Sequence, residues 1–321
     1  MLEIILPLLA GLALFLFAVT SLSEVLKDIF SEKAKNIIAR FTKNLFTAIL
    51  TGCVITILMD SSSAVIVMTI VFVNSRILTF RQAMGIVMGA NIGTTISSQI
   101  IAMDVGKYSS IPLFLGFLLL FVAKTERIKS YGRILLYFGI LFFGLFTMER
   151  AVEPLRDSAD FEKWMTTLEN PLKGSLIGGL VTLIIQSSSA TVGIAITLAK
   201  KGLLEVGGGI AVMLGAELGT CSDTLLATLK TNRQAVKTGV FHLTFNLISI
   251  IFGLALFEYF VQLVLFISKG QTVDNQIANA HVLFNVMGVI IFLPFVGLVE
   301  KLLNRWIPEK QPVALKETSV L

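Results

Sequence analysis

The fold of this chain is decided by Ser61-Ser62-Ser63-Ala64, which recurs as Ser187-Ser188-Ser189-Ala190. Each copy lies in the middle of a long apolar stretch: residues 45–73 carry one charged side chain, Asp60, and residues 174–199 carry none. Polar groups at membrane depth are unfavourable unless they find partners or line a cavity. The same serine motif in two apolar stretches therefore predicts one binding site built from two halves.

The composition is that of a polytopic membrane protein. Of the 321 residues, 55% are hydrophobic and 15% are charged, whereas a soluble domain carries about 25% charged residues. Several stretches exceed the roughly 20 apolar residues that cross a bilayer. The net charge of +5 does not indicate a nucleic-acid partner, because the basic residues of membrane proteins collect in cytoplasmic loops.

A tandem duplication relates the two serine motifs, which are 126 residues apart. At the same offset Asp60 corresponds to Gln186, and Gly-Ala-Asn-Ile-Gly-Thr at residues 89–94 corresponds to Gly-Ala-Glu-Leu-Gly-Thr at residues 215–220. Self-similarity of this kind indicates repeated structural units. We predict repeat 1 at residues 1–126, repeat 2 at 127–260, a C-terminal transmembrane helix at 261–306 and a cytoplasmic tail at 307–321.

The path of the two serine segments, at about residues 45–73 and 174–199, decides the topology. As straight helices they would be about 40 Å long, against a hydrocarbon core of about 30 Å. They are either tilted spans or re-entrant hairpins with the serines at the tip, and the central position of the serines favours hairpins. Hairpins give three crossings per repeat, so that the second repeat is inverted, whereas spans would make the repeats parallel.

We therefore predict an all-α polytopic membrane protein with two inverted-topology repeats, each with a re-entrant helical hairpin, plus one C-terminal transmembrane helix. An amphipathic stretch precedes each hairpin, at residues 24–43 and 149–170, and is expected to lie in the membrane interface. In either topology the distribution of basic residues places the N-terminus outside and the C-terminus in the cytoplasm.

Three consecutive hydroxyls at a hairpin tip provide both donors and acceptors. The tip also precedes the N-terminus of the returning helix, whose free N–H groups suit an oxyanion. Two such tips meeting near the bilayer midplane would form a substrate site of the kind found in transporters. The alternative is that the serines bond back to carbonyls inside plain packed helices.

The Gly-Ala-x-x-Gly-Thr segments carry a second signal. Two glycines four residues apart can form a helix-packing face. The polar residues beside them, Asn91 or Glu217 and the following threonines, instead favour a local helix break whose carbonyls and hydroxyls bind sodium.

These paired motifs resemble the type II sodium/phosphate cotransporter family, whose hallmark is Gln-Ser-Ser-Ser in each inverted repeat. Two further segments, residues 242–246 and 281–285, resemble that family's His-x-x-Phe-Asn elements. A His and an Asn four residues apart share a helix face, which favours hydrogen bonds between helices, and a pH-sensing role is the alternative. The resemblance covers most of residues 1–300 and implies sodium-coupled transport of phosphate rather than an enzymatic activity.

The resemblance, together with the acidic residues Asp60, Glu217 and Asp223 of this sequence, gives the following expected site residues. Phosphate is expected to contact Ser61, Ser62, Ser63, Ser187, Ser188, Ser189 and Gln186. Sodium is expected to contact Asp60, Asn91, Thr94, Thr95, Gln186, Glu217, Thr220 and Asp223. Supporting positions are Gly89, Gly93, Gly215, Gly219, His242, Asn246, His281 and Asn285.

Two positions depart from the family pattern. Asp60 stands where the family has Gln, and Glu217 stands where it has Asn. Two carboxylates near a phosphate would repel it unless cations or protons neutralise them. Either they strengthen sodium binding, or one carries a coupled proton, or the substrate is a different oxyanion. The structural alternative is a pair with a basic residue such as His242.

The prediction is a sodium-coupled secondary transporter of inorganic phosphate in a bacterial inner (plasma) membrane. Its partners are phosphate, sodium and the lipid bilayer, with no nucleic acid and no organic cofactor; a homo-oligomer is left open. The alternatives are a proton-coupled or export-direction transporter of phosphate or another small oxyanion. A membrane-embedded serine hydrolase with His242 as base is remote, because a nucleophilic serine needs a positioned base and the duplication repeats the serines without one.

Overall fold

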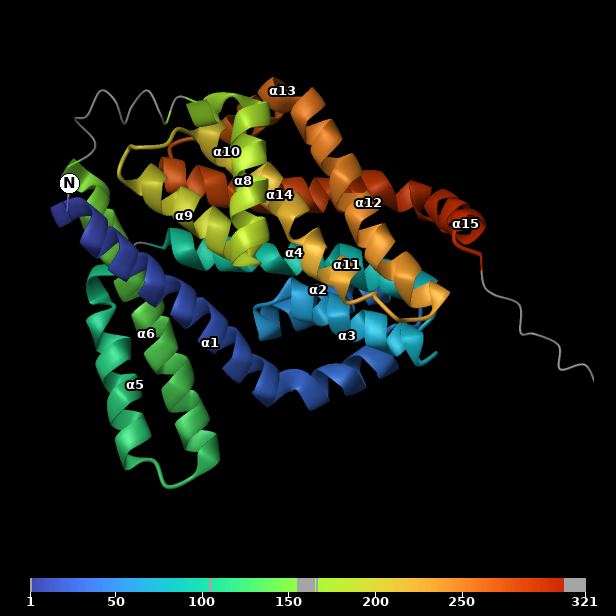
Figure 1. Cartoon of the computed structure of the whole chain (residues 1–321), viewed down its shortest axis with the longest axis horizontal. Helices are drawn as coiled ribbons and strands as arrows, with labels where there is room; N and C mark the ends of the chain where they lie inside the picture. The colour runs from blue at the N-terminus through green and yellow to red at the C-terminus, as the bar shows by residue number, and fades with distance from the viewer. Residues whose placement is uncertain (1, 104–105, 155–164, 166, 309–321) are drawn as a thin grey trace, which may run out of the picture.

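A computed structural model of the chain describes residues 2–103, 106–154, 165 and 167–308 (Figure 1). All regular elements in this described part are helical, which confirms the predicted all-α class. The helices of repeat 1 and its neighbours are α1 (Leu2–Phe41), α2 (Leu45–Met59), α3 (Ser62–Asn74), α4 (Phe80–Ala102), α5 (Ser110–Val122) and α6 (Glu126–Val152). They are followed by α8 (Pro171–Ile185), α9 (Ser188–Lys200), α10 (Val206–Gly219), α11 (Cys221–Leu226), α12 (Arg233–Ala255), α13 (Phe257–Ile267), α14 (Val273–Phe292) and α15 (Val296–Trp306).

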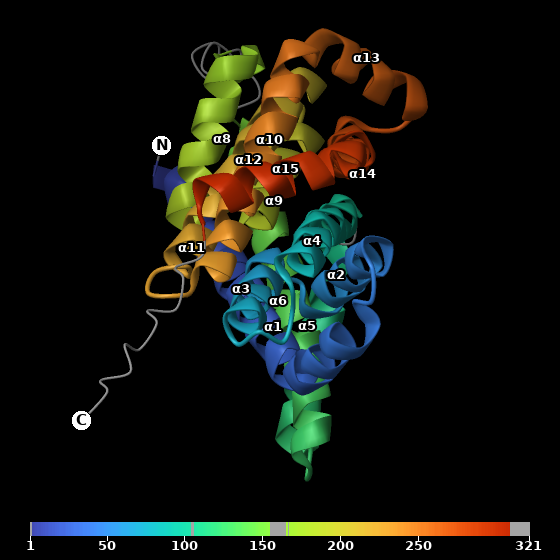
Figure 2. The ribbon, with the colours of Figure 1, turned by 90° about the vertical axis from the view of Figure 1, so that its right-hand side faces the viewer.

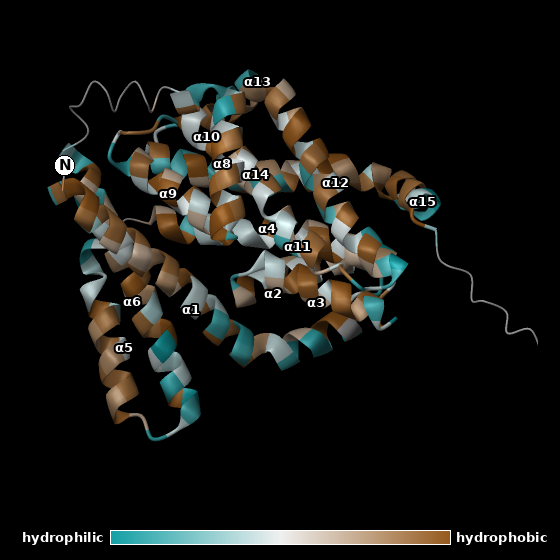
Figure 3. Ribbon diagram, in the orientation of Figure 1, coloured by the Kyte–Doolittle hydropathy of each residue, from teal (hydrophilic) through white to brown (hydrophobic). Residues whose placement is uncertain are grey.

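Several of these helices are suited to cross a bilayer. By length and composition the candidates are Leu2–Ile38, Glu126–Val152, Arg233–Ala255 and Val273–Trp306, and a fifth joins α4 and α5 across a bend. Figure 3 shows apolar residues along α5 and much of the bundle, with hydrophilic residues gathered on the second half of α1 and at the turn between α5 and α6. The prediction of a polytopic membrane protein is confirmed.

The first helix differs from its prediction. α1 is one continuous, curved helix of 40 residues that passes along α2 and α3 (Figure 1), rather than a span followed by a separate interfacial helix. Val25, Ala34 and Ile38, within the predicted interfacial stretch, are buried against the protein. Of the corresponding stretch in repeat 2, residues 155–164 and 166 lie outside the described residues, as does nearly all of the predicted tail.

The duplication is visible in the helix boundaries. α2 and α8 begin at Leu45 and Pro171 and end at Met59 and Ile185, so both ends are 126 residues apart. The ends of α3 and α9 are related by the same offset. Asn44 and Asn170 cap the first helix of each pair through their side chains. Local sequence therefore produces the same helix–break–helix unit twice.

Close packing between helices explains the glycines of the Gly-Ala-x-x-Gly-Thr segments. A Cβ atom on Gly89 would overlap the Ile49 carbonyl of α2, and one on Gly215 would overlap the Ser175 carbonyl of α8. α4 runs unbroken through residues 89–94, so the helix break expected there is absent. Only repeat 2 is interrupted, at Thr220 between α10 and α11. The two glycine segments thus act first as packing faces.

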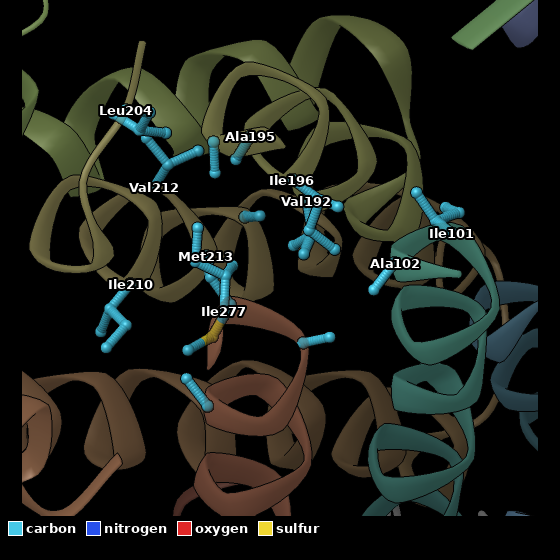
Figure 4. Close-up of a cluster of buried hydrophobic side chains, with 14 of the residues drawn as sticks. Ile101, Ala102, Val192, Ala195, Ile196, Leu204, Ile210, Val212, Met213 and Ile277 are labelled. Atoms are coloured by element: carbon cyan, nitrogen blue, oxygen red, sulfur yellow. The ribbon is translucent and has the colours of Figure 1, made fainter. Parts of the chain in front are cut away.

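The core joins both repeats to α14. Figure 4 shows Val192 and Ile196 of α9, Met213 of α10, Ile277 of α14 and Ile101 of α4 among a cluster of buried side chains. A second core cluster lies around α2, α3, α4 and α12. α5 and α6 pair with each other and project from one end of the molecule (Figure 2).

The second helix of each serine unit docks on the opposite repeat. The backbone N–H of Asn232 donates to Asn74 Oδ1 at the end of α3, over 2.8 Å. At the matching end of α9, Lys200 Nζ donates to the carbonyls of Ile101 and Met103 at the end of α4, over 3.1 and 3.3 Å. Asn74 and Lys200 are related by the repeat offset. Each repeat therefore holds the end of the other repeat's second serine helix, which places the two breaks near each other.

Candidate functional site

Both serine motifs open into one cavity of about 240 Å³. The first break contributes Asp60, Ser61, Ser62 and Ser63, and the second contributes Ile185, Gln186, Ser187, Ser188 and Ser189. Thr220 and a face of α1 complete the wall. The volume is several times the ~30 Å³ that one water molecule occupies, so a small oxyanion fits with ions or water beside it.

Each break has the same backbone geometry. Asp60 and Gln186 end the first helix in the left-handed region, with φ of 48° and 59°. Ser61 and Ser187 then cap the second helix, and their Oγ atoms accept hydrogen bonds from the N–H groups of Ala64 and Ala190 at 3.2 Å. The first N–H groups of α3 and α9 have no intrahelical partners and lie in the part of the chain that lines the cavity. Two helix N-termini therefore face one small space.

The second break is the tip of a hairpin. Thr182 Oγ1 donates to Thr191 Oγ1 over 2.7 Å, although the two residues are nine apart. In an unbroken helix they would be separated by about 13.5 Å along the axis, so the chain must fold back between them. The corresponding residues in repeat 1 are Thr56 and Val65, and Val65 has no hydroxyl to offer.

Each repeat has a carboxylate near the serine tips, but these two carboxylates are at different positions of the repeat. Asp60 of the first tip accepts a hydrogen bond from Ser97 of α4 at Oδ1, and its carbonyl accepts one from Ser23 of α1 at 3.1 Å. The repeat partner of Ser97 is Asp223, which lies within hydrogen-bonding range of Ser63. Repeat 1 thus carries its acid on the break, whereas repeat 2 carries Gln186 there and its acid on α11.

Glu217 pairs with His281, a supporting position whose contact with Glu217 the sequence did not predict. His281 Nε2 of α14 lies 2.7 Å from Glu217 Oε1, and the other ring nitrogen lies 2.7 Å from Ser98 Oγ of α4. Both side chains are buried, with 0% and 4% of their surface exposed. The predicted alternative of an internal pair is therefore present, but with His281 instead of His242.

His242 makes the corresponding contact in repeat 2, although the two histidines are not related by the repeat offset. Its Nδ1 lies 2.8 Å from Thr224 Oγ1, and Thr224 is the repeat partner of Ser98. Asn246, one turn on, donates to the Glu217 carbonyl and accepts from Asn91 at 2.8 Å. The predicted interhelical hydrogen bonds of the His-x-x-Phe-Asn elements are confirmed for His242, Asn246 and His281. Asn285, by contrast, donates within α14 to the His281 carbonyl.

A sequence model of the Na⁺/Pi-cotransporter family matches residues 14–150 and again residues 156–292. The chain belongs to the Na⁺/Pi-cotransporter family. The resemblance seen in the serine motifs is thereby confirmed, and the second match continues through the last residue of α14.

Three relatives of this family member illustrate the similarity. It is 29% identical over 311 residues to the uncharacterized protein YqeW of Bacillus subtilis, covering 94% of this chain and 99% of that one. It is 24% identical to the "Putative inorganic phosphate export protein YjbB" of Escherichia coli over 91% of this chain, which spans about half of that relative (54%). It is 31% identical over 160 residues, 48% of this chain and 22% of the relative, to the sodium-dependent phosphate transport protein 2A of Rattus norvegicus. No solved structure matches the chain.

Some of the residues expected to bind sodium line the cavity, and others lie outside it. Asp60, Gln186 and Thr220 line it, and Asp223 lies beside it. The remaining expected positions are elsewhere: Asn91 and Glu217 belong to the buried network, while the Thr94 and Thr95 hydroxyls donate to carbonyls of their own helix. Glycines 89, 93, 215 and 219 pack helices against one another.

The α1 wall of the cavity was not predicted from the sequence. Val19, Thr20, Ser23, Glu24 and Lys27 of α1 line it. The available signal was the spacing of Thr20, Ser23 and Lys27, which places three polar residues on one helix face. That signal was hidden because residues from 24 onward were assigned to an interfacial helix.

Proposed function

We propose that this chain is a sodium-coupled secondary transporter of inorganic phosphate, which binds phosphate between the two serine tips. The observation that carries the proposal is that both tips, each at a helix N-terminus, line one cavity. Membership of the Na⁺/Pi-cotransporter family supports the assignment, as does the name of the rat relative.

The chemistry of the tips suits a tetrahedral oxyanion. Each helix N-terminus is equivalent to about half a positive charge, and its free N–H groups point toward a ligand that lies beyond the cap. The hydroxyls of Ser62, Ser63, Ser188 and Ser189 can donate to further oxygens. Phosphate would be held from opposite sides by two equivalent sets of donors.

The carboxylates explain why transport would require a cation. Asp60 in the wall and Asp223 beside it are both negative when ionised, and each would repel phosphate at this range. Sodium takes oxygen ligands from carboxylates, hydroxyls and carbonyls, as at other transporter sites. Sodium bound next to Asp60, Gln186 and Thr220 would neutralise the wall, so that phosphate binds well only after sodium.

The proposal includes a topology. The two serine units enter the bilayer from opposite sides as re-entrant hairpins, so that the repeats are inverted and the tips meet near the midplane. The N-terminus lies outside and the C-terminus in the cytoplasm. Support comes from the fold-back at Thr182 and Thr191 and from the reciprocal contacts of α3 and α9.

A second candidate is export of phosphate by the same site. The name of the Escherichia coli relative favours it. Import and export use the same binding residues, because the direction of a secondary transporter follows the ion and substrate gradients.

The test is uptake of radiolabelled phosphate by proteoliposomes under inward and outward sodium gradients, with a proton gradient as a separate condition. We expect flux to follow the sodium gradient and to be abolished by Ser62→Ala or Ser188→Ala. Ser130→Ala, on α6 and not among the residues that line the cavity, is the matched control and should transport normally. Well-folded protein with no phosphate flux under any of these gradients would contradict the proposal.

A further inference from the structure

The α1 wall of the tip cavity carries a cation. Within the described part of the chain, Lys27 is the only lysine or arginine that lines the cavity. It is half-buried, and none of the ion pairs found among the described residues within 4.0 Å involves it. Lys27 is therefore a positive charge at the cavity that forms no ion pair within 4.0 Å among the described residues.

The other charges around Lys27 are negative. Glu24 lies one turn earlier on α1 and Asp60 lies in the first tip, and both line the same cavity. Asp223 approaches from α11. An oxyanion entering this space meets three carboxylates, two helix N-termini that each supply a fractional charge, and one full positive charge. Removing that one charge would leave the wall strongly repulsive to an anion.

The chemistry of lysine fits this position. Its ammonium is a compact charge with three donors on a flexible four-carbon stem, so it can follow an anion between the mouth of the cavity and the tips. The stem packs along apolar surface while the charged end reaches a polar space. α1 thereby contributes a movable charged donor to a site that also holds the fixed donors of the two tips.

We propose that Lys27 is an anion-recognition residue of the cavity, which binds the entering oxyanion together with the serine tips and sets the affinity for it. This inference rests on the proposed function, because it requires that the cavity takes an oxyanion. It adds a contact from α1, outside both serine motifs, and assigns it to recognition rather than to the coupling ion.

The experiment compares Lys27→Gln, Lys27→Arg and Lys33→Gln in saturating sodium. Lys33 is the matched control, because it is exposed on the same helix and its loss removes the same charge. Two readouts are the half-saturating phosphate concentration for transport and the shift in melting temperature of purified protein with phosphate or sulfate. We expect Lys27→Gln to raise the half-saturating concentration at least about tenfold, equivalent to ~1.4 kcal/mol. Lys27→Arg and Lys33→Gln should stay near the wild type.

Restoring the positive charge by chemical modification of a folded cysteine variant distinguishes loss of the charge from a folding defect. Lys27→Cys should behave like Lys27→Gln, and modification with a methanethiosulfonate that carries an ammonium should restore phosphate affinity, whereas a sulfonate reagent should not. Wild-type protein treated in parallel controls for Cys53 and Cys221. Equal oxyanion affinity in Lys27→Gln and wild type would overturn the role of Lys27 while leaving the proposed function intact. If neither phosphate nor sulfate stabilises or is carried by the wild type, both fail.

Discussion

Thr182 and Thr191 share a 2.7 Å hydrogen bond across the second serine tip, and their repeat partners, Thr56 and Val65, cannot form one. Thr56 Oγ1 is consequently the one buried side-chain nitrogen or oxygen without a hydrogen-bond partner among the described residues. A buried polar group left unsatisfied costs about 1–3 kcal/mol. The two tips thus share a backbone geometry but differ in how firmly their helices are joined.

Val65→Thr should supply the missing partner. The repeat 2 geometry predicts a hydrogen bond from Thr56 to the new hydroxyl, and we expect stabilisation of about 1 kcal/mol. The measurement is the melting temperature of the purified protein in detergent. Val71→Thr is the control, because Val71 is 53% exposed on the same helix and should give no gain. A Val65→Thr protein less stable than wild type would argue against equivalent tips.

His281→Leu should be strongly destabilising, because it leaves Glu217 buried without its partner. Breaking a buried pair by removing one member typically costs 3–5 kcal/mol. Adding Glu217→Met to the same protein should recover much of the loss, since the buried carboxyl that lost its partner is then removed as well. Thermal unfolding of both variants measures this, with the exposed Glu258→Gln as control. If the double variant were no better than His281→Leu, the pair would not be the cause.

Asp60→Asn should alter sodium dependence more than the fold. The amide oxygen can still accept from Ser97, so the tip is retained, but the negative charge that would attract sodium and repel phosphate is lost. We expect the half-saturating sodium concentration to rise and phosphate binding without sodium to become tighter. Sodium titrations of transport and of phosphate-induced stabilisation measure these effects, and Asp28→Asn, exposed on α1, is the control. An unchanged sodium profile would remove Asp60 from the coupling site.

Gly89→Ala should destabilise the protein, because the added methyl would overlap the Ile49 carbonyl. Overpacking of this kind costs about 1–3 kcal/mol. Gly207→Ala meets nothing within 4 Å, and there the better helix propensity of Ala should be neutral or add up to about 1 kcal/mol. A lower melting temperature for Gly89→Ala, with none for Gly207→Ala, would support a packing role, and a well-folded Gly89→Ala protein with altered sodium affinity alone would refute it.

Much of the repeat architecture was readable from local signals. The 126-residue offset predicted the paired serine units, and the helix boundaries at Leu45, Pro171, Ser62 and Ser188 follow it. The breaks were predictable because a serine at an N-cap and a polar residue at a helix end act over a few residues. The family followed from the same motifs. These features depend on residues that are close together in the sequence, so a single sequence is enough to predict them.

Tertiary structure decided which residues from other helices these segments contact. The sequence marked Glu217 as an acid in need of a partner, but only packing places His281 of α14 against it, 64 residues away. Only packing turns the residues of α1 around Ser23 and Lys27 into a wall of the cavity, and uses Gly89 for close contact in an unbroken α4. The physical reason is range: caps and turns are set by adjacent backbone groups, whereas the partner of a buried charge depends on how separate helices come together.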